Sequence, residues 1–206
     1  MKYKIIDNFL SDLEFEELKR HVLPFQTESF GPQDNFVNWI YAGKTVPDWA
    51  HQNPELDEPK HCKEVTDIEL VDPVHDWYFA NELFFQGFRS PDMPFLNDIL
   101  NKIKPLAIHR IQANFTVQQE KRRRNLFHID YNESNKRTSM NTSIFYMNTT
   151  NGPTLLEDGT EIECRANRLV TYPYDTYHTG VLCTDQPYRI VINLNYFTPE
   201  QEVLDK

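Results

Sequence analysis

The chain has little cysteine, no long apolar run and no excess of basic charge. Its three cysteines are odd in number and widely spaced, which excludes a disulfide framework and a cysteine zinc motif. We therefore expect ordinary thiols in a reducing, cytoplasmic setting. No apolar stretch reaches the length of a transmembrane helix, and the first residues lack the apolar region of a signal peptide. We expect no membrane partner.

Positive charge is also scarce. The formal net charge is -10 at pH 7, so bulk electrostatics disfavour nucleic acid and anionic surfaces as general partners. Linkers, internal repeats and low-complexity runs are absent, and 206 residues suffice for one well-buried core. We expect a single domain over 1–206, with 1–105 as helical and irregular support and 106–197 as the core.

The N-terminal half is expected to support the core formed by 106–197. Residues 3–6 predict a short strand, and Ser11 with Glu14 forms a capping box that predicts a helix ending before Pro24. Residues 27–62 contain many turn residues and one possible strand at 36–41. This stretch forms either a substrate wall or lid, or an irregular cover. The apolar side of the first helix is expected to carry Leu13, Leu18, His21 and Val22.

Two further helices are predicted at 73–86 and 94–104, from apolar and aromatic residues near helical spacing. From residue 106 onward the period changes to two, which indicates short strands separated by turns. Asn151-Gly152 and Asp158-Gly159 are tight-turn signals, and the second predicts a hairpin. Helices followed by many short strands favour one α+β domain, with helices packed on an antiparallel sandwich or barrel. The expected strands are 108–117, 142–147, 155–156, 161–164, 168–172, 178–182 and 188–197.

The main chemical motif is His128-x-Asp130. In a strand, residues two apart leave the same face of the sheet, so both side chains can bind one metal. About one such match is expected by chance in a chain of this composition, so the motif alone is weak. His178, which opens a later predicted strand, can complete the two-His-one-carboxylate set typical of non-haem Fe(II) oxygenases. The alternative for each His is a buried structural residue.

Arg189 strengthens the metal interpretation. It follows His178 by a short interval at the start of a very apolar strand, so a hairpin would place it beside the metal ligand. Its planar guanidinium suits a buried carboxylate of a co-substrate. By period two, Asn193 and Asn195 share its face of the strand, where they either line a pocket or satisfy hydrogen bonds at the barrel end.

The ordered set of motifs resembles the Fe(II)- and 2-oxoglutarate-dependent oxygenases, and among them the prolyl-4-hydroxylase-like group. The resemblance covers roughly 106–197, and the order and spacing of the set are more specific than any single piece. The matching pieces are His128-x-Asp130, Ser143-Ile144-Phe145-Tyr146-Met147-Asn148, Asn151-Gly152, Arg168-Leu169-Val170-Thr171-Tyr172-Pro173, His178 and Arg189.

The resemblance implies a double-stranded β-helix (jelly roll) with supporting N-terminal helices. It implies Fe(II) held by His128, Asp130 and His178, with 2-oxoglutarate and O2 as co-substrates. Arg189 and Tyr146 are then expected to bind the distal carboxylate of 2-oxoglutarate. Asn114 is a further candidate contact, although the prolyl-hydroxylase pattern favours a tyrosine near this position and the chain has Phe115 and Thr116 there.

The implied activity is a dioxygenase that hydroxylates a protein or peptide side chain. The alternatives are a non-catalytic cupin-like metal- or ligand-binding module, or an oxygenase acting on a small molecule or nucleic acid. A basic run at 121–124, followed by Lys136-Arg137, either is a solvated loop or forms a positive rim that steers an anionic substrate. The sequence does not name the substrate or the oligomeric state.

Overall fold

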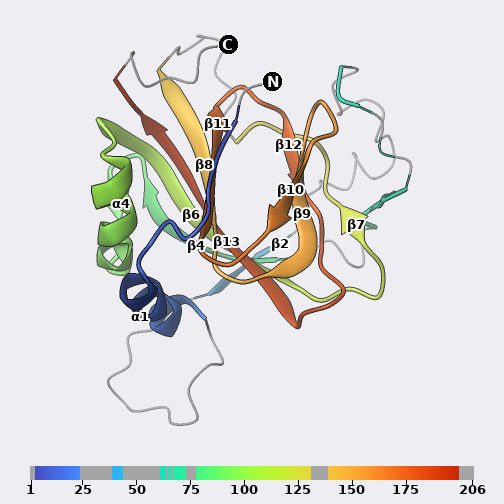
Figure 1. Ribbon diagram of the computed structural model, residues 1–206, viewed down its shortest axis with the longest axis horizontal. Helices are drawn as coiled ribbons and strands as arrows, with labels where there is room; N and C mark the ends of the chain where they lie inside the picture. The colour runs from blue at the N-terminus through green and yellow to red at the C-terminus, as the bar shows by residue number, and fades with distance from the viewer. Residues whose placement is uncertain are drawn as a thin grey trace.

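The computed structural model describes residues 3–23, 39–43, 61–63, 65, 67–72, 78–130 and 139–199. In these residues a large antiparallel sheet and a smaller sheet face each other, and helices cover the outer face of the large sheet (Figure 1). The predicted jelly roll with supporting helices is confirmed. Several predicted segments lie partly or wholly outside the described residues. They are the possible lid at 27–62, residues 73–77 at the start of a predicted helix, Tyr131 and Lys136-Arg137.

Helix α1 (Asp12–Val22) begins at the predicted capping box. The Glu14 amide donates to Ser11 Oγ at 3.4 Å, and the Ser11 amide donates to the Glu14 carboxylate at 2.7 Å. The prediction that Leu13 faces the core is wrong, because Leu13 is 74% exposed. It lies two positions before the buried Phe15, and two helical steps turn a side chain to the opposite side. The buried residues of α1 are Phe15, Leu18 and Val22.

A second helical segment covers the same face of the large sheet. A 3-10 turn, η1 (Met93–Leu96), leads into α4 (Asn97–Ile103), close to the predicted 94–104. The helix ends at Lys104, whose φ of 52° is left-handed, and Pro105 cannot continue it. His21 of α1 stacks on Phe95 of η1 with ring centroids 3.8 Å apart, so this histidine belongs to the helical layer.

The large sheet has the order β1-β11-β8-β13-β6-β4-β2, and β5 pairs with β4. Its neighbouring strands are all antiparallel. The strands β11, β8, β13 and β6 lie at its centre, so its middle comes from the region predicted to be strands. The bounds are β1 (Lys4–Ile6), β2 (Ile40–Gly43), β4 (Tyr78–Phe85), β5 (Phe88–Arg89), β6 (Ala107–Val117), β8 (Met140–Tyr146), β11 (Arg168–Pro173) and β13 (Tyr188–Phe197).

The small sheet has the order β10-β9-β12, with β9 (Thr150–Leu156), β10 (Glu161–Cys164) and β12 (His178–Gly180). The predicted Asp158-Gly159 turn joins β9 to β10, and Gly159 has the positive φ of 83° that favours glycine. A short parallel pair consists of β3 (Glu69–Leu70) and β7 (Arg123–Arg124). An isolated bridge joins Arg124 of β7 to Val181, the residue that follows β12.

The predicted helix at 73–86 is wrong in its described part, because residues 78–85 form β4. This strand pairs with β6, and its register shifts between Glu82 and Phe84. The shift breaks the period of two, so the apolar spacing imitates a helix. Aromatic side chains suit a pleated, half-buried surface, and pairing with a distant strand decides the outcome.

Two connections also differ from the predictions. β12 and β13 do not form a hairpin, because β12 pairs with β9 in the small sheet while β13 pairs with β6 and β8 in the large one. Asn151-Gly152 is no turn but lies inside β9. A Cβ at Gly152 would collide with the Val181 carbonyl oxygen, so this glycine serves close packing.

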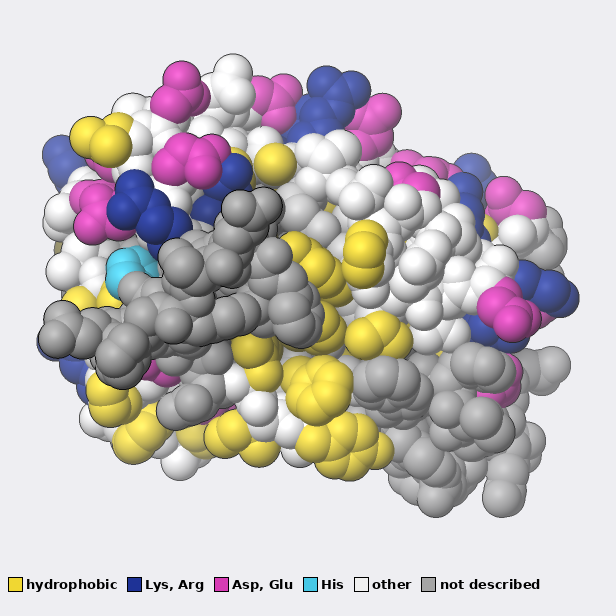
Figure 2. All heavy atoms as spheres, turned by 90° about the horizontal axis from the view of Figure 1, so that it is seen from below, with side chains coloured by type: hydrophobic (Ala, Val, Ile, Leu, Met, Phe, Trp, Pro, Cys, Tyr) yellow, Lys and Arg dark blue, Asp and Glu magenta, His cyan; other side chains and the backbone are white. Residues whose placement is uncertain are grey.

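The apolar residues form two main layers. One lies between the helices and the large sheet and includes Phe145, Ile111 and Ile192, and the other lies between the sheets and includes Tyr146, Leu156 and Val170. Figure 2 shows hydrophobic side chains gathered on one face of the molecule, with charged side chains around its margin. None of the described helices is long and apolar enough to cross a membrane.

Candidate functional site

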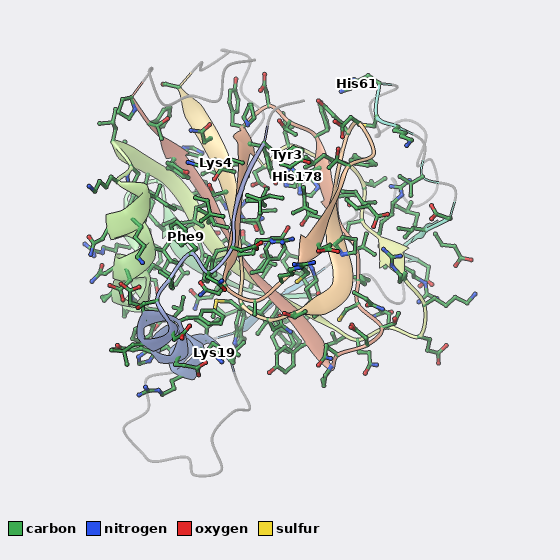
Figure 3. The ribbon with its side chains drawn as sticks, in the orientation of Figure 1. Tyr3, Lys4, Phe9, Lys19, His61 and His178 are labelled. Atoms are coloured by element: carbon green, nitrogen blue, oxygen red, sulfur yellow. The ribbon has the colours of Figure 1, made fainter. Side chains whose placement is uncertain are left out.

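His128 and His178 lie side by side between the sheets. They form an isolated antiparallel bridge, in which the His128 amide donates to the His178 carbonyl at 3.0 Å and the reverse bond measures 2.9 Å. Figure 3 shows His178 on the inner side of β12. Asp130 Oδ1 lies 3.7 Å from His128 Nε2 and 3.6 Å from His178 Nε2. The three predicted ligands therefore converge, with ligand atoms within 4.8 Å of one another.

The ring orientations leave both Nε2 atoms facing Asp130. His128 Nδ1 lies 3.0 Å from the Leu126 carbonyl and His178 Nδ1 lies 3.2 Å from the Thr176 carbonyl, so we assign the proton of each ring to Nδ1. His178 Nε2 is buried and makes no hydrogen bond, since its distance to Asp130 is too long for one. Two imidazole lone pairs and one carboxylate oxygen suit a divalent transition metal, and the backbone bonds at Nδ1 are typical of metal-binding histidines.

Charges in this group are strongly coupled. Burial would raise the pKa of Asp130, but the charges of His178 and His128 and a hydrogen bond from Asn195 outweigh it and lower the pKa well below its usual range. Burial lowers the pKa of His178, but Asp130 outweighs it and the pKa of His178 is raised. Burial and the charge of His178 lower the pKa of His128, although 49% of its side-chain surface is exposed. Asp130 is therefore ionised, as a metal ligand must be.

Asn195 holds the second carboxylate oxygen. Its amide nitrogen donates to Asp130 Oδ2 at 3.0 Å and to Thr142 Oγ1 at 3.0 Å. The first bond leaves Asp130 Oδ1 turned toward the two histidines. Asn193, two residues earlier on the same face of β13, lines the cavity instead. The alternation predicted for this strand is therefore present, and the two asparagines differ in what they contact.

A cavity of about 470 Å³ opens beside the three predicted ligands, and Arg189 lines it. Arg189 is 6% exposed; its Nε donates to the Gly152 carbonyl at 2.8 Å and its Nη2 donates to Thr154 Oγ1 at 3.2 Å. Among the described residues no carboxylate pairs with it. A buried guanidinium without an anionic partner is costly, so the cavity beside Arg189 favours an anion.

The two other predicted co-substrate residues lie at different depths. Tyr146 is fully buried, and its hydroxyl donates to Thr154 Oγ1 at 2.8 Å. Its ring lies under the Arg189 guanidinium at 5.8 Å. Asn114 lines the cavity and accepts a hydrogen bond from Gln112 at 2.8 Å. Thr154, which the sequence reasoning missed, joins Tyr146 to Arg189 and lines the cavity; no local motif marks it.

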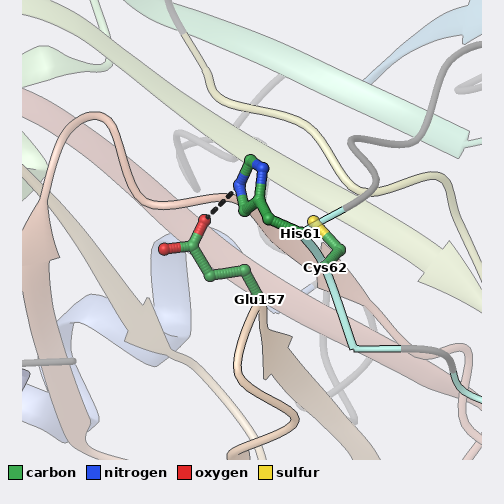
Figure 4. Close-up of side chains that lie close together, drawn as sticks. All are labelled: His61, Cys62 and Glu157. Atoms are coloured by element: carbon green, nitrogen blue, oxygen red, sulfur yellow. Dashed lines mark hydrogen bonds and ion pairs between the residues drawn. The ribbon is translucent and has the colours of Figure 1, made fainter.

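A second group of potential metal ligands lies outside the cavity (Figure 4). His61 Nε2 and Glu157 Oε2 are 3.1 Å apart, with Cys62 beside them. Glu157 Oε2 also accepts from the Tyr177 amide at 3.2 Å, and the Lys63 amide donates to the Glu157 carbonyl at 2.7 Å. His61 is 60% exposed. These bonds fasten 61–63 to the end of the small sheet, next to His178.

The basic run 121–124 is paired with acids. Lys121 lies 3.9 Å from Glu69, Arg122 lies 3.6 Å from Glu161 and Arg123 lies 3.7 Å from Asp72. Arg124 packs over the Phe127 ring at 5.5 Å. Three of the four basic side chains therefore have an acidic neighbour near the surface, which partly offsets the positive charge of the run.

The fold has known counterparts. The non-haem alpha-ketoglutarate-dependent epimerase SnoN from nogalamycin biosynthesis matches with a TM-score of 0.54 at 11% identity, over 99% of this chain and 83% of that one. The chain has the fold of a 2-oxoglutarate-dependent oxygenase. No protein-family model matches the sequence, and no curated protein matches it.

Two prolyl hydroxylases are also similar in structure. The enzyme from Trichoplax adhaerens, in complex with a hypoxia inducible factor peptide, matches with a TM-score of 0.49 at 13% identity, over 95% of this chain and 83% of that one. The viral collagen prolyl hydroxylase from Paramecium Bursaria Chlorella virus-1 matches with a TM-score of 0.49 at 12% identity, over 97% of both chains.

Proposed function

We propose that the chain is an Fe(II)- and 2-oxoglutarate-dependent dioxygenase that hydroxylates a protein or peptide side chain. The observation that carries the proposal is one cavity lined by two chemically distinct groups of side chains. Two histidines and an ionised aspartate converge in it, and it is also lined by a buried arginine that has no anionic partner among the described residues. A metal-binding module that does not use a carboxylate ligand has no need of the second feature.

In this proposal His128, Asp130 and His178 hold the iron. When bound, Fe(II), 2-oxoglutarate and O2 together couple the oxidative decarboxylation of the 2-oxo acid to oxidation of a substrate C–H bond, giving succinate and CO2. The protein supplies ligand placement, co-substrate binding and exclusion of water. Because both Nδ1 atoms are hydrogen-bonded to backbone carbonyls, the rings are held with Nε2 directed inward.

Arg189 is proposed to bind the distal carboxylate of 2-oxoglutarate. Its Nε and Nη2 are engaged by Gly152 and Thr154, which fixes the plane of the guanidinium and leaves Nη1 N–H groups for a ligand. Tyr146 is proposed to act at the same end, by holding Thr154 through its hydroxyl. Asn114 faces the same cavity and is proposed as a further polar contact to the co-substrate.

Calorimetry with Mn(II), which occupies such sites without turnover, tests the proposal. We expect 2-oxoglutarate to bind when Mn(II) is present, and His128→Ala to abolish Mn(II) binding. Arg189→Ala should weaken 2-oxoglutarate by at least about 100-fold, because it removes charge-assisted hydrogen bonds in a buried site. Arg165→Ala, on the exposed turn after β10, is the matched control.

The proposal fails if the wild-type protein with Mn(II) releases no heat on addition of 2-oxoglutarate. It also fails if Arg189→Ala and Arg165→Ala bind 2-oxoglutarate equally well. Succinate formation with Fe(II) and a peptide panel is the second measurement, and it addresses the substrate class directly. His128→Ala and Arg189→Ala should each abolish succinate formation.

A further inference from the structure

One wall of the cavity is a polar stripe on strand β6. Arg110, Gln112, Asn114 and Thr116 alternate along the strand, and all four line the cavity. The residues between them, Ile111, Ala113 and Phe115, belong to the core beneath the helices. A period of two places the two sets on opposite faces. Apolar side chains predominate in most ligand pockets, so a polar wall indicates a polar substrate.

Arg110 gives this wall its charge. The basic residues that line the cavity in the described chain are Arg110 and Arg189, and Arg189 is assigned to the co-substrate end. Arg110 Nε lies 3.1 Å from a carboxylate oxygen of Glu82 on β4. Its terminal N–H groups have no partner among the described residues, and its side chain is 29% exposed. A guanidinium held at Nε with its two terminal nitrogens available matches a carboxylate.

Three amide side chains line the same cavity as Arg110. Gln112 donates to the Asn114 side-chain oxygen at 2.8 Å, which leaves the Gln112 oxygen and the Asn114 nitrogen for other partners. Asn193 faces Gln112 from β13 and lines the cavity, and its side chain makes no hydrogen bond among the described residues. Its side-chain oxygen is a buried acceptor without a donor. Amides offer one acceptor and two donors each, which is complementary to peptide groups.

We propose that this wall binds an acidic peptide segment, with Arg110 pairing with a carboxylate and the amides of Gln112, Asn114 and Asn193 pairing with adjacent peptide groups. The proposal rests on the proposed function, since it names the substrate class of the same cavity. Glu82 occupies one side of Arg110, so the wall takes one carboxylate. The net charge of -10 opposes long-range attraction of acidic peptides, so recognition depends on this local contact.

The test uses the full-length protein loaded with Mn(II) and 2-oxoglutarate. The probes are capped alanine-glycine peptides with a single Asp or Glu, each paired with its Asn or Gln counterpart. A second arm uses free amino acids paired with their carboxamides. We expect each acidic peptide to bind about 10- to 100-fold more tightly than its amide counterpart, which is the range for a charge-assisted hydrogen bond.

Three variants locate the effect. Arg110→Gln should remove the preference for the carboxylate, while Arg165→Gln, the same change on an exposed turn, should keep it. Glu82→Gln should increase the preference, because it removes the competing carboxylate from Arg110. Thermal unfolding of each variant checks its fold, and the wild-type comparison of paired peptides stands even if Arg110→Gln does not fold.

The outcomes separate the two proposals. If the wild-type protein does not bind 2-oxoglutarate, the proposed function fails before any peptide is tested. If 2-oxoglutarate binds but acidic and amide peptides bind equally, or neither binds at millimolar concentration, the acidic-peptide proposal is overturned and the proposed function stands. Binding of free amino acids alone would show that the carboxylate comes from a small molecule, and would likewise overturn the peptide assignment.

Discussion

The two faces of strand β6 have different surroundings: one packs in the hydrophobic core and the other lines the cavity. The face toward the helices carries Ile111, Ala113 and Phe115, which are buried among apolar side chains of α1, α4 and β13. The face toward the small sheet carries Arg110 and the amides beside it, which line a cavity. The same backbone therefore contributes to folding through one set of residues and to binding through the other. The comparison teaches that stability and ligand binding should respond to different substitutions on adjacent residues.

The largest expected effect on stability lies on the helix-facing side. Ile111→Ala should lower the free energy of unfolding by about 2–5 kcal/mol, since it removes a fully buried side chain and leaves a cavity. Gln112→Ala, one residue further and on the cavity face, should cost about 1 kcal/mol through its lost hydrogen bond to Asn114. Urea unfolding of both variants measures the difference. Equal losses would break the comparison between the two faces.

A second prediction concerns the space beside Arg189. Gly152→Ala should place a methyl group against the Val181 carbonyl and 3.2 Å from Arg189 Cδ, so the backbone must shift. Overpacking of this kind costs about 1–3 kcal/mol and should displace Arg189 from its bond to residue 152. We expect weaker 2-oxoglutarate binding by calorimetry. Gly180→Ala, whose methyl would meet Arg189 at an ordinary 3.7 Å, is the control and should bind more tightly than Gly152→Ala.

A third prediction concerns Asn195, which lies on the cavity face of β13 and holds Asp130. Asn195→Ala should weaken Mn(II) binding by about 10- to 100-fold, because it releases the second oxygen of Asp130. Asn141→Ala makes the same change on β8, where the asparagine bonds Thr198 and contacts no metal ligand. Titration with Mn(II) compares the two. Equal affinities would mean that the hydrogen bond from Asn195 does not orient Asp130.

The smallest expected effect lies at a sheet edge, away from both faces. Arg168 Nε and Nη2 bind Asp7 at 2.6 and 3.0 Å, and hydrogen bonding to Arg168 lowers the pKa of Asp7 below 3.8. A lowered pKa stabilises the fold above pH 4, and this contribution is lost as the pH falls through the folded-state pKa. Asp7→Asn should thus cost under about 1 kcal/mol at pH 7, since the carboxylate is half exposed.

Unfolding at pH 7 and at pH 3 tests this prediction. The difference between the wild-type protein and Asp7→Asn should shrink at the lower pH, because pH 3 lies below the ordinary pKa of 3.8 and protonation of Asp7 then favours the unfolded chain. Asp67→Asn, at an exposed residue without an ion-pair partner in the described chain, should show no such change. A difference that grows on acidification would contradict the role assigned to the Asp7–Arg168 pair.

Local signals predicted the parts of the molecule that depend on nearby residues. Ser11 and Glu14 marked the start of α1, and the turn residues Asp158-Gly159 marked the β9–β10 hairpin. The alternation of residues with a period of two predicted β10 and β13 with the observed bounds. It also predicted that Arg189 and Asn193 lie on the same face of β13. His128, Asp130 and His178 were recognisable because metal chemistry restricts the residue types and their order.

The failures involve partners that are distant in sequence. β4 was predicted as a helix because its pairing with β6 and its register shift leave no local trace. The expected β12–β13 hairpin was wrong because the chain crosses between the sheets after Gly180. Thr154 belongs to the candidate site because it contacts Tyr146 and Arg189, which are distant from each other in sequence. Such contacts depend on how the two sheets face each other. The spacing of residues along the chain does not predict that arrangement.

The reciprocal backbone bonds between His128 and His178 have a consequence for how the protein folds. The two residues are far apart in the chain, and closing so long a loop is slow and costs conformational entropy. The bridge connects the start of β12, which pairs with β9, to the segment around His128. We therefore expect metal binding to require this long-range pairing, so that loss of metal affinity would signal loss of the pairing.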